Sequence, residues 1–349
     1  MSHKLLEGLG APRYRDVDIE RTVYPKGSVV LIVDMDTLIF RVASACQKDY
    51  IKVTNKEGKS RDFKHRTEFK AYCAERDWDF KEFTIEDKVE AEPLKNCLAV
   101  LKKSVAKLQR DFGVTHIELY QGGEDNFRLD LPLDSRYKSN RKEEKPVHLK
   151  DCQDYAVNYL GSKIVKGLET DDIVQMRFVD CTKQDGVICY LATVDKDAKQ
   201  VFQSEHTYRI INLASWMIET FKGGFGEIHM NSREEVKGSG LIWLLFQVMQ
   251  GDSIDNYAQK KLFPKKYGEK SFFKDFSKID NIPDLLRKYV EITKARLPEV
   301  VRYIAWDGSE VEMDWLQTQE LFWQCAYMKV EPNDTMTFEK LLKEHNIEY

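Results

Sequence analysis

The chain has 349 residues, of which 42% are apolar and 32% are charged, and its formal net charge is −4 at pH 7. This length suits one large domain or two ordinary ones, and this composition is that of a packed globular protein rather than a disordered chain. So small a net charge neither favours nor excludes a nucleic-acid partner, for which only local basic patches would argue.

Cysteine usage and hydropathy exclude further classes of protein. The seven cysteines are odd in number and contain no Cys-x-x-Cys pair, so we expect reduced thiols rather than a disulfide framework or a zinc ribbon. No N-terminal signal peptide is recognisable, and the longest apolar run, residues 241–249, is too short to cross a membrane. We therefore expect a soluble, cytoplasmic protein with no membrane contact.

The first part of the chain predicts one buried strand and an insertion. Residues 1–27 mix charge, Pro and Gly without a period and read as an N-terminal extension. Residues 28–33 form a continuous β-rich apolar run, as in a central parallel strand, and a helical pattern follows it. Residues 50–90 predict a β-hairpin and a helix inserted at the edge of the sheet, and residues 94–108 predict an amphipathic helix.

The middle of the chain alternates strands and helices. Strands are predicted at residues 115–120, 163–165, 187–194 and 208–213, and a helix at about 149–160. We interpret this alternation as an α/β fold with a central, mostly parallel sheet flanked by helices.

After Gly226 the pattern changes, and no further strand is predicted. Residues 241–250 predict a helix that ends at Gly251, and residues 260–270 are basic and rich in loop signals. From about residue 283 the chain reads as helices to its end.

Acidic residues gather in two groups. Glu169, Asp171 and Asp172 lie where a loop becomes a helix, and Asp195 and Asp197 lie where an apolar strand ends. Five acids in two tight groups repel one another unless a cation lies between them, and hard oxygen ligands suit Mg²⁺, Mn²⁺ or Ca²⁺. A solvated helix start and an ordinary turn would explain either group alone, but the two together favour a metal site.

The predicted strands bring these acids to one place. Asp34, Glu169 and Asp195 each lie at or just past the carboxyl end of a predicted strand. In an open parallel sheet those ends converge on the crevice where ligands bind, so acids far apart in the sequence become one cluster.

A local basic run stands out on this acidic chain. It consists of Arg136, Lys138, Arg141, Lys142 and Lys145. Lys138 and Arg141 have the spacing of one helical face, for which a solvated surface is the ordinary interpretation and phosphate binding the functional one.

These motifs together resemble the flap endonuclease/5′-nuclease superfamily, and most closely its bacteriophage 5′–3′ exonuclease branch. The resemblance covers roughly residues 28–275 and keeps the motifs in the order of the family. They are Val-Asp34, Phe-Arg128, Tyr137-Lys138-x-x-Arg141, Glu169-x-Asp171-Asp172, Asp195-x-Asp197 and Gly-Asp252-x-x-Asp255-Asn.

The resemblance implies hydrolysis of phosphodiester bonds with two Mg²⁺ ions, which Mn²⁺ can replace. Its metal ligands would be Asp34, Glu169, Asp171, Asp172, Asp195, Asp197, Asp252 and Asp255. Lys138 and Arg141 would contact the scissile phosphate as catalytic groups, and Arg128, Tyr137 and Lys142 would contact the nucleic acid near it.

The resemblance also implies a helix–three-turn–helix that grips duplex phosphates, with a potassium ion. The stretch from Tyr267 to Ser271 matches the later half of that element, although Lys266 replaces its first glycine. Lys265, Lys266 and Lys270 are therefore expected to bind nucleic-acid phosphates.

The domain organisation implied is an extension at 1–27, a nuclease core at 28–235, the helix–three-turn–helix at 236–282 and a helical region at 283–349 that packs on the core. The core would contain the insertion at 50–90 and a short helical gateway at 137–166. Substrates would be duplex ends, 5′ flaps or RNA–DNA hybrids, cut by a monomer during phage DNA replication or recombination in a bacterial host, with replication proteins as partners.

The largest departure from the family is Gln121, where an aspartate ligand is expected at the end of the second strand. Glu124 or Asp125 could replace it, and we expect Glu124 as the substitute ligand. The alternative is a weakened metal site, or a protein that binds DNA and cuts it poorly.

A haloacid-dehalogenase-type phosphatase is a second alternative. Asp34-Met-Asp36-Thr resembles its first motif, and Gly251-Asp252-Ser resembles its last. That last motif should end a strand, whereas residues 241–250 predict a helix.

Overall fold

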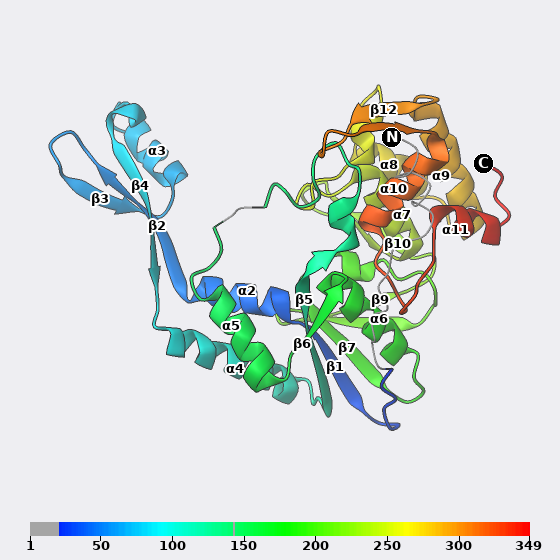
Figure 1. The fold of residues 1–349 in the computed structure, drawn as a ribbon, viewed down its shortest axis with the longest axis horizontal. Helices are drawn as coiled ribbons and strands as arrows, with labels where there is room; N and C mark the ends of the chain where they lie inside the picture. The colour runs from blue at the N-terminus through cyan, green and yellow to red at the C-terminus, as the bar shows by residue number, and fades with distance from the viewer. Residues whose placement is uncertain (1–20, 142–143) are drawn as a thin grey trace. The chain divides into compact units, whose positions relative to one another are not determined.

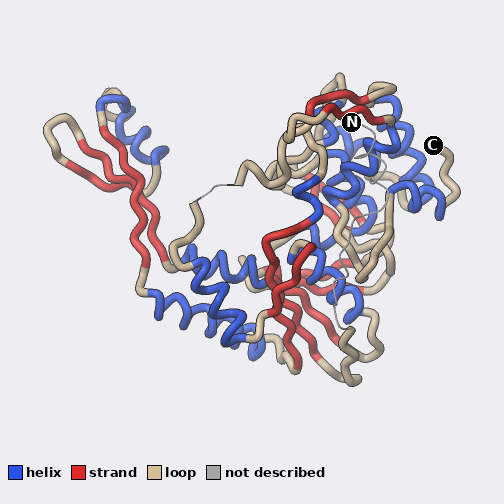
Figure 2. The backbone as a smooth tube through the Cα atoms, in the orientation of Figure 1, coloured by secondary structure: helices blue, strands red, loops and turns tan. Residues whose placement is uncertain are grey.

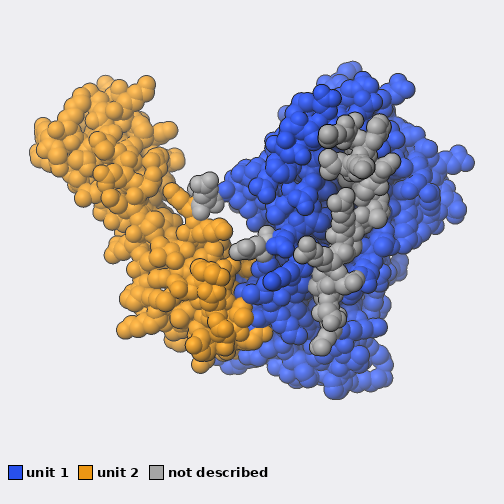
Figure 3. All heavy atoms as spheres, in the orientation of Figure 1, with its two compact units in different colours: residues 1–35, 109–143, 162–349 blue, residues 36–108, 144–161 orange. Residues whose placement is uncertain are grey.

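The computed structural model describes residues 21–141 and 144–349, except for the side chain of Glu124. The chain divides into two compact units (Figure 3). Unit 1 comprises Met1–Met35, Gln109–Glu143 and Ser162–Tyr349, and unit 2 comprises Asp36–Leu108 and Glu144–Gly161. Most of the extension expected at residues 1–27 lies outside the described residues.

Unit 1 is built on a mostly parallel sheet (Figure 1). Its strands are β1 (Val29–Asp34), β5 (His116–Asn126), β6 (Lys163–Gly167), β7 (Ile188–Thr193), β8 (Thr207–Asn212) and β9 (Ile218–Lys222). Their order is β6-β5-β1-β7-β8-β9, and every pair is parallel except β8 with β9. The predicted α/β fold class is confirmed.

One helix of unit 1, α6 (Thr170–Thr182), packs on β1, β5 and β7. A buried ion pair fixes it there, because Arg177 on α6 donates from Nε and Nη2 to both carboxylate oxygens of Glu118 on β5, each at 2.8 Å. The Tyr120 hydroxyl donates to the same carboxylate at 2.6 Å. The amino end of α6 is therefore held at the carboxyl edge of the sheet.

The second half of unit 1 is mainly helical. Its helices are α7 (Gly240–Gln250), α8 (Glu269–Phe276), α9 (Ile282–Arg296), α10 (Trp315–Ala326) and α11 (Phe338–Glu344), and the 3₁₀ turn η5 (Gln259–Leu262) lies between α7 and α8. The 3₁₀ turns η2 (Phe127–Asp130) and η4 (Asp197–Lys199) lie earlier in unit 1, after β5 and β7. Every residue of α7 is buried, as expected of a helix that is apolar on all sides. α7 is the centre of a large apolar core that includes residues of α8 to α11.

The prediction that no strand follows Gly226 is wrong. Two antiparallel hairpins occur there, formed by β10 (Glu227–Met230) with β11 (Val236–Ser239) and by β12 (Val301–Ile304) with β13 (Glu310–Met313). Each strand has four residues, too few to show a period in the sequence, and cross-strand pairing rather than an apolar run holds each hairpin together. The region after residue 283 is therefore helical with a hairpin inserted.

Unit 2 contains an antiparallel sheet of its own, shown with the adjoining α3 in Figure 2. Its elements are α2 (Met35–Ala45), β2 (Gln47–Thr54), β3 (Ser60–Phe63), α3 (Arg66–Ala74), η1 (Phe80–Glu82), β4 (Thr84–Ala91), α4 (Leu94–Asp111), α5 (Leu149–Tyr155) and the π-helical turn η3 (Ala156–Leu160). The sheet has the order β3-β2-β4. The hairpin and helix predicted at 50–90 are thus present, but they do not extend the edge of the central sheet, because β2 pairs with β3 and β4.

Within the described residues, no helix is both long enough and apolar enough to cross a membrane.

The buried Glu320 joins α10 to α11 and should make stability depend on pH. Its carboxylate accepts the backbone N–H groups of Phe338 at 3.2 Å and Glu339 at 2.7 Å. Burial nevertheless raises the pKa of Glu320 to about 7. Because the folded state then binds this proton more tightly than the unfolded state, stability is greatest below the unfolded pKa and falls as the pH rises through the folded one.

We expect the free energy of unfolding of the wild type to fall between pH 5 and pH 7.5 by more than that of Glu320→Gln. The difference should be of order 1 kcal/mol or more, at about 1.4 kcal/mol per unit of pKa difference. Urea unfolding of both proteins across this range measures it, with the exposed Glu310→Gln as control. Parallel pH profiles for wild type and Glu320→Gln would contradict the assignment.

Candidate active site

The carboxyl ends of two central strands carry two of the predicted acids. Asp34 is the last residue of β1, and Asp195 follows the last residue of β7 by two positions. Thr193, at the end of β7, donates its hydroxyl to the Asp34 carboxylate at 2.9 Å. The chain winds from β1 to β5 and β6 on one side and to β7 and β8 on the other, so the two acids lie where a doubly wound sheet binds its ligands.

The amino end of α6 brings three further acids to this edge. Glu169 precedes the first residue of α6, and Asp171 and Asp172 lie in its first turn. The backbone N–H of Glu169 donates to the Asp172 carboxylate at 3.3 Å, which satisfies one of the free donors at the helix end. Acids are favoured in this first turn by the helix dipole.

Asp171 and Asp195 are two buried carboxylates of the group, and the charge of Lys138 offsets that of Asp171 only in part. Burial raises the pKa of Asp171 well above its usual range, and the charges of Asp195 and Asp34 raise it further. Burial and the neighbouring Asp197 do the same to the pKa of Asp195. Among the described residues, none forms an ion pair with either carboxylate. The two therefore raise the free energy of the folded state unless protons or cations neutralise them.

Asp197 and Asp252 extend the acidic group towards α7. The Lys196 ammonium lies 2.7 Å from the Asp252 carboxylate, and Gln247 on α7 donates its amide to Asp197. Burial raises the pKa of Asp197 to about 7. Burial alone would raise the pKa of Asp252 too, but the bond from Lys196 lowers it below its usual value.

The two predicted catalytic cations reach this acidic group from one turn. Lys138 forms an ion pair with Glu169, and the Arg141 guanidinium lies 2.8 Å from Asp255. Burial alone would lower the pKa of Lys138, but Glu169 and Asp255 raise it above its usual value. The structure thus brings Lys138 and Arg141 beside Glu169 and Asp255, which are two of the acids predicted as metal ligands.

The prediction of a helical gateway at 137–166 is wrong for the first residues of this range. Residues 137–141 form turns rather than a helix, and Lys138 has the left-handed φ of 60°. Helix begins at Leu149, as predicted, and continues into η3. A left-handed residue cannot be part of a right-handed helix, so Lys138 and Arg141 do not share a helical face.

Arg128 is buried and does not fit the expected contact with nucleic acid. Its guanidinium donates to both carboxylate oxygens of Asp172 at 2.6 and 2.9 Å, and to the carbonyl oxygens of Gln324 at 3.1 Å and Tyr327 at 2.7 Å. Nη1 also lies 3.3 Å from Glu169. Asp172 accepts a further bond from the backbone of Lys329 at 3.1 Å. Arg128 and Asp172 therefore tie the start of α6 to the segment after α10.

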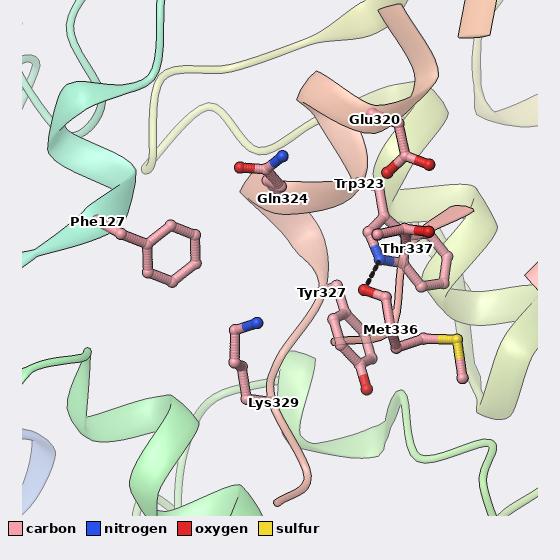
Figure 4. Close-up of a pocket in the computed structure, with 8 residues that line it drawn as sticks. All are labelled: Phe127, Glu320, Trp323, Gln324, Tyr327, Lys329, Met336 and Thr337. Carbon is pink, nitrogen blue, oxygen red and sulfur yellow. Dashed lines mark hydrogen bonds between the residues drawn. The ribbon is translucent and has the colours of Figure 1, made fainter. Parts of the chain in front are cut away.

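Figure 4 shows the same segment beside a small pocket, where Phe127 lies across from Tyr327 and Lys329. The Lys329 ammonium lies 5.6 Å from the centre of the Phe127 ring, and the Trp323 indole donates to Met336 at 3.3 Å. These contacts fix the segment that holds Arg128.

Tyr137 is buried as well, so a contact with a flanking base is not open to it in this conformation. Its hydroxyl donates to Asp255 at 2.9 Å and lies 3.3 Å from Glu169. Its role in the structure is to hold two of the carboxylates in place.

Gln121 differs from expectation in its position. The strand does not end at Tyr120 but continues, because Gln121 and Gly122 pair with Ile164 and Val165 of β6. Tyr120 pairs with Asp34 in register, and side chains alternate along a strand, so Gln121 lies on the opposite face. Its amide oxygen accepts a bond from Ser162 on that face at 3.5 Å.

Two predicted residues lie outside the description. Nothing is described of the side chain of Glu124, the expected substitute ligand, or of Lys142. Asp125, the other substitute considered, is exposed.

The lysines of the expected helix–three-turn–helix follow α7. Lys265 and Lys266 are exposed in the loop before α8, and Lys270 on α8 pairs with Glu234 at 2.5 Å. α7, the loop from Gly251, η5 and α8 reproduce a helix–loop–helix order, and Lys265 and Lys266 are among its exposed cations.

The acids have the chemistry of a magnesium site but are not gathered as one. Within the described residues, no three or more His, Cys, Asp or Glu side chains are arranged so that they could hold a metal ion. Lys138, Arg141 and Lys196 form ion pairs with Glu169, Asp255 and Asp252. The raised pKa values of Asp171 and Asp195 show that these carboxylates influence one another nonetheless, because charge acts over longer distances than coordination does.

Several residues that shape the site were given no role by the sequence analysis, although Asn256 belongs to a quoted motif. They are Thr193, Lys196, Gln247 and Asn256. Thr193, Lys196 and Asn256 lie within two residues of predicted acids in the sequence, a signal that could have drawn attention to them, whereas nothing in the sequence marks Gln247 among the apolar residues of α7.

No protein-family model matches this chain, and no curated protein matches it either. Two solved structures are similar to it over most of its length. One is the T5 D15 protein co-crystallized with metal ions, with 14% identity, a TM-score of 0.44 and coverage of 91% of this chain and 96% of that one. The other is a mutant of the T5 5′-exonuclease, with 13% identity, a TM-score of 0.43 and coverage of 91% and 97%. Likenesses at these identities and TM-scores carry no argument about function, which is therefore argued from the site.

We expect Arg128→Lys to destabilise the protein strongly. A lysine cannot bridge Asp172 and two carbonyl groups at once, and breaking a buried ion pair costs about 3 kcal/mol or more. Urea unfolding measures the loss, and Arg302→Lys is the matched control, because Arg302 pairs with Glu312 at the surface. Equal stability of the two variants would refute the anchoring role of Arg128.

Proposed function

We propose that this chain is a divalent-metal-dependent 5′–3′ nuclease that hydrolyses phosphodiester bonds in duplex or branched DNA or in RNA–DNA hybrids. The observation that supports it most is a group of buried acids in which Asp171 and Asp195 form no ion pair among the described residues, while Lys138 and Arg141 pair with their neighbours Glu169 and Asp255. A phosphodiester needs cations to neutralise its charge and an activated water to attack it, and the side chains of this group would supply oxygen ligands for such cations.

Seven acids would hold the metal ions: Asp34, Glu169, Asp171, Asp195, Asp197, Asp252 and Asp255. Asp172 is omitted because Arg128 occupies both of its oxygens. The ions, Mg²⁺ or Mn²⁺, would supply the acidity that activates water and neutralise charge on the phosphate.

Lys138 and Arg141 would exchange partners on loading. In the structure they neutralise Glu169 and Asp255, and a divalent cation beside these carboxylates would take over that role. The Arg141 side chain is 52% exposed and the Lys138 side chain is 16% exposed. Arg141 would therefore meet an approaching phosphate from the solvent side, and Lys138 would contact the phosphate from a mostly buried position. Positive charge in this position stabilises the charge that develops on the phosphate in the transition state.

The phosphatase alternative loses its support, because the residues before Gly251 form the helix α7 rather than a strand. Binding of DNA with little cleavage remains the second candidate, since Gln121 brings no carboxylate to the sheet edge. The following test separates the two.

We expect the wild type to release 5′-phosphorylated products from 5′-labelled duplex, flap, gapped and hybrid substrates with Mg²⁺, and none with EDTA. Asp171→Asn and Asp195→Asn should each lower cleavage on the order of 10²-fold or more, as expected for groups that organise transition-state charge, and leave DNA binding intact. Asp185→Asn, at an exposed ion pair with Lys26, is the control. Metal-independent cleavage, or full activity of both variants, would overturn the proposal, and binding without cleavage would favour the second candidate.

The exposed Lys265 and Lys266 should bind duplex phosphates. Replacing both by Ala should weaken binding and reduce the slope of log K against log salt concentration by about 0.9 for each lost contact. Fluorescence anisotropy of a labelled duplex at several salt concentrations measures the slope. Lys102→Ala with Lys103→Ala, two exposed neighbours on α4, is the matched control. An unchanged slope for the Lys265 and Lys266 variant would place the duplex elsewhere.

A further inference from the structure

Lys138 depends for its position on a loop that is distant in sequence. Residues 252–257 form a compact loop after α7, closed by two backbone bonds between Asp252 and Tyr257 of 3.0 and 3.2 Å. Gly251 begins it with a φ of 75°, and a Cβ there would lie 2.1 Å from the carbonyl oxygen of Tyr257. The Asp252 carboxylate accepts the N–H of Ile254 at 2.6 Å. Hydrogen bonds within the loop therefore stabilise its conformation.

This loop is bonded along its length to the turn at 136–141. The backbone N–H of Lys138 donates to the Asp255 carbonyl at 2.9 Å, and the Asn140 amide donates to the carbonyl of Ser253. Asn256 donates its amide to the Arg136 carbonyl at 3.2 Å and to the Ser139 hydroxyl at 3.0 Å. The Asn256 side chain therefore forms hydrogen bonds with residues that precede and follow Lys138 in the chain.

The turn needs such support, because Lys138 has the left-handed φ of 60°. A residue other than glycine pays a steric cost in this region and keeps the conformation only where its surroundings impose it. Asn256 itself has a φ of 62°, a conformation that asparagine tolerates better than most residues. Asn256 can therefore hold its own left-handed conformation while its side chain binds the residues on both sides of Lys138.

We propose that Asn256 is a positioning residue that sets the direction of Lys138 towards the scissile phosphate. The inference rests on the proposed nuclease function, and it assigns to Asn256 no contact with substrate. Asn256 acts through the backbone of Arg136 and the side chain of Ser139, and so its loss should affect the chemical step through Lys138.

Asn256→Gly separates this role from backbone strain. Glycine adopts a positive φ at no steric cost, and it lacks the side-chain amide that donates the hydrogen bonds to Arg136 and Ser139. We expect kcat to fall roughly tenfold, as for the loss of hydrogen bonds of ordinary strength, with little change in DNA affinity. In the background of Lys138→Ala the same change should have almost no further effect, because residues that act through one another are not additive.

Asn333→Ala is the matched control for strain. Asn333 is exposed and has the same φ of 62°, and no hydrogen bond or ion pair among the described residues links it to the turn at 136–141. Asn256→Ala and Asn333→Ala should both lose the tolerance of asparagine for this φ, and only the former should lower kcat.

Tryptic cleavage gives a measurement that is independent of activity. The bonds after Arg136 and Lys138 should be cut faster in Asn256→Gly than in the wild type, because cleavage follows local opening of the turn, and the rate in Asn333→Ala should not change. If the wild type proves not to be a nuclease, this measurement still decides whether Asn256 holds the turn. Normal kcat with normal tryptic protection in Asn256→Gly would overturn the inference and leave the proposed nuclease function untouched.

Discussion

Mutual repulsion of carboxylates at one edge of the sheet is the constraint on which the rest of this site depends. Asp34, Asp171 and Asp195 come together because the ends of β1 and β7 and the start of α6 meet there. Burial raises the pKa values of Asp171 and Asp195 well above their usual range, so each charge raises the energy of the fold. Cations from other segments offset this cost only in part, through Lys138, Arg141 and Lys196.

A second constraint comes from the end of the chain. Arg128 joins Asp172 to the carbonyl groups of Gln324 and Tyr327, in a contact from which water is excluded. A buried ion pair of this kind adds little stability over an apolar pair, but it permits few alternative arrangements, since each unpaired donor would be costly. The helical half of unit 1 thus fixes the orientation of the α6 start, and with it the directions of Glu169 and Asp171.

Arg128, Arg141 and Lys138 differ in how many oxygen atoms their side chains bind. Arg128 is saturated by carbonyl and carboxylate oxygens and has no capacity for a phosphate, whereas Arg141 has one carboxylate partner and is half exposed. Lys138 lies between these extremes, held at its backbone by Asp255 and at its ammonium by Glu169. In this arrangement each of the cations Lys138 and Arg141 has a carboxylate partner, which lowers the mutual repulsion of the acids.

The sequence alone determined the buried parallel strands and the places of the acids at their ends. Buried parallel strands are continuous apolar runs, and so β1, β7 and β8 could be recognised, and Asp34 and Asp195 could be placed at strand ends. The helix α7 was recognisable because it is apolar on all sides. These are local signals, which depend on residues near one another in the chain.

Only the tertiary structure decided which charged residues are free to act. Arg128 and Arg141 look alike in the sequence, but one is enclosed by residues about 200 positions away and the other faces solvent. The turn at Lys138 was mistaken for helix because a spacing of three fits both, and its left-handed φ is imposed by contacts with residues 253–256. Gln121 was expected against the acids, and its pairing with β6 decided otherwise. Such outcomes depend on contacts between segments far apart in the chain, for which hydropathy and spacing carry no signal.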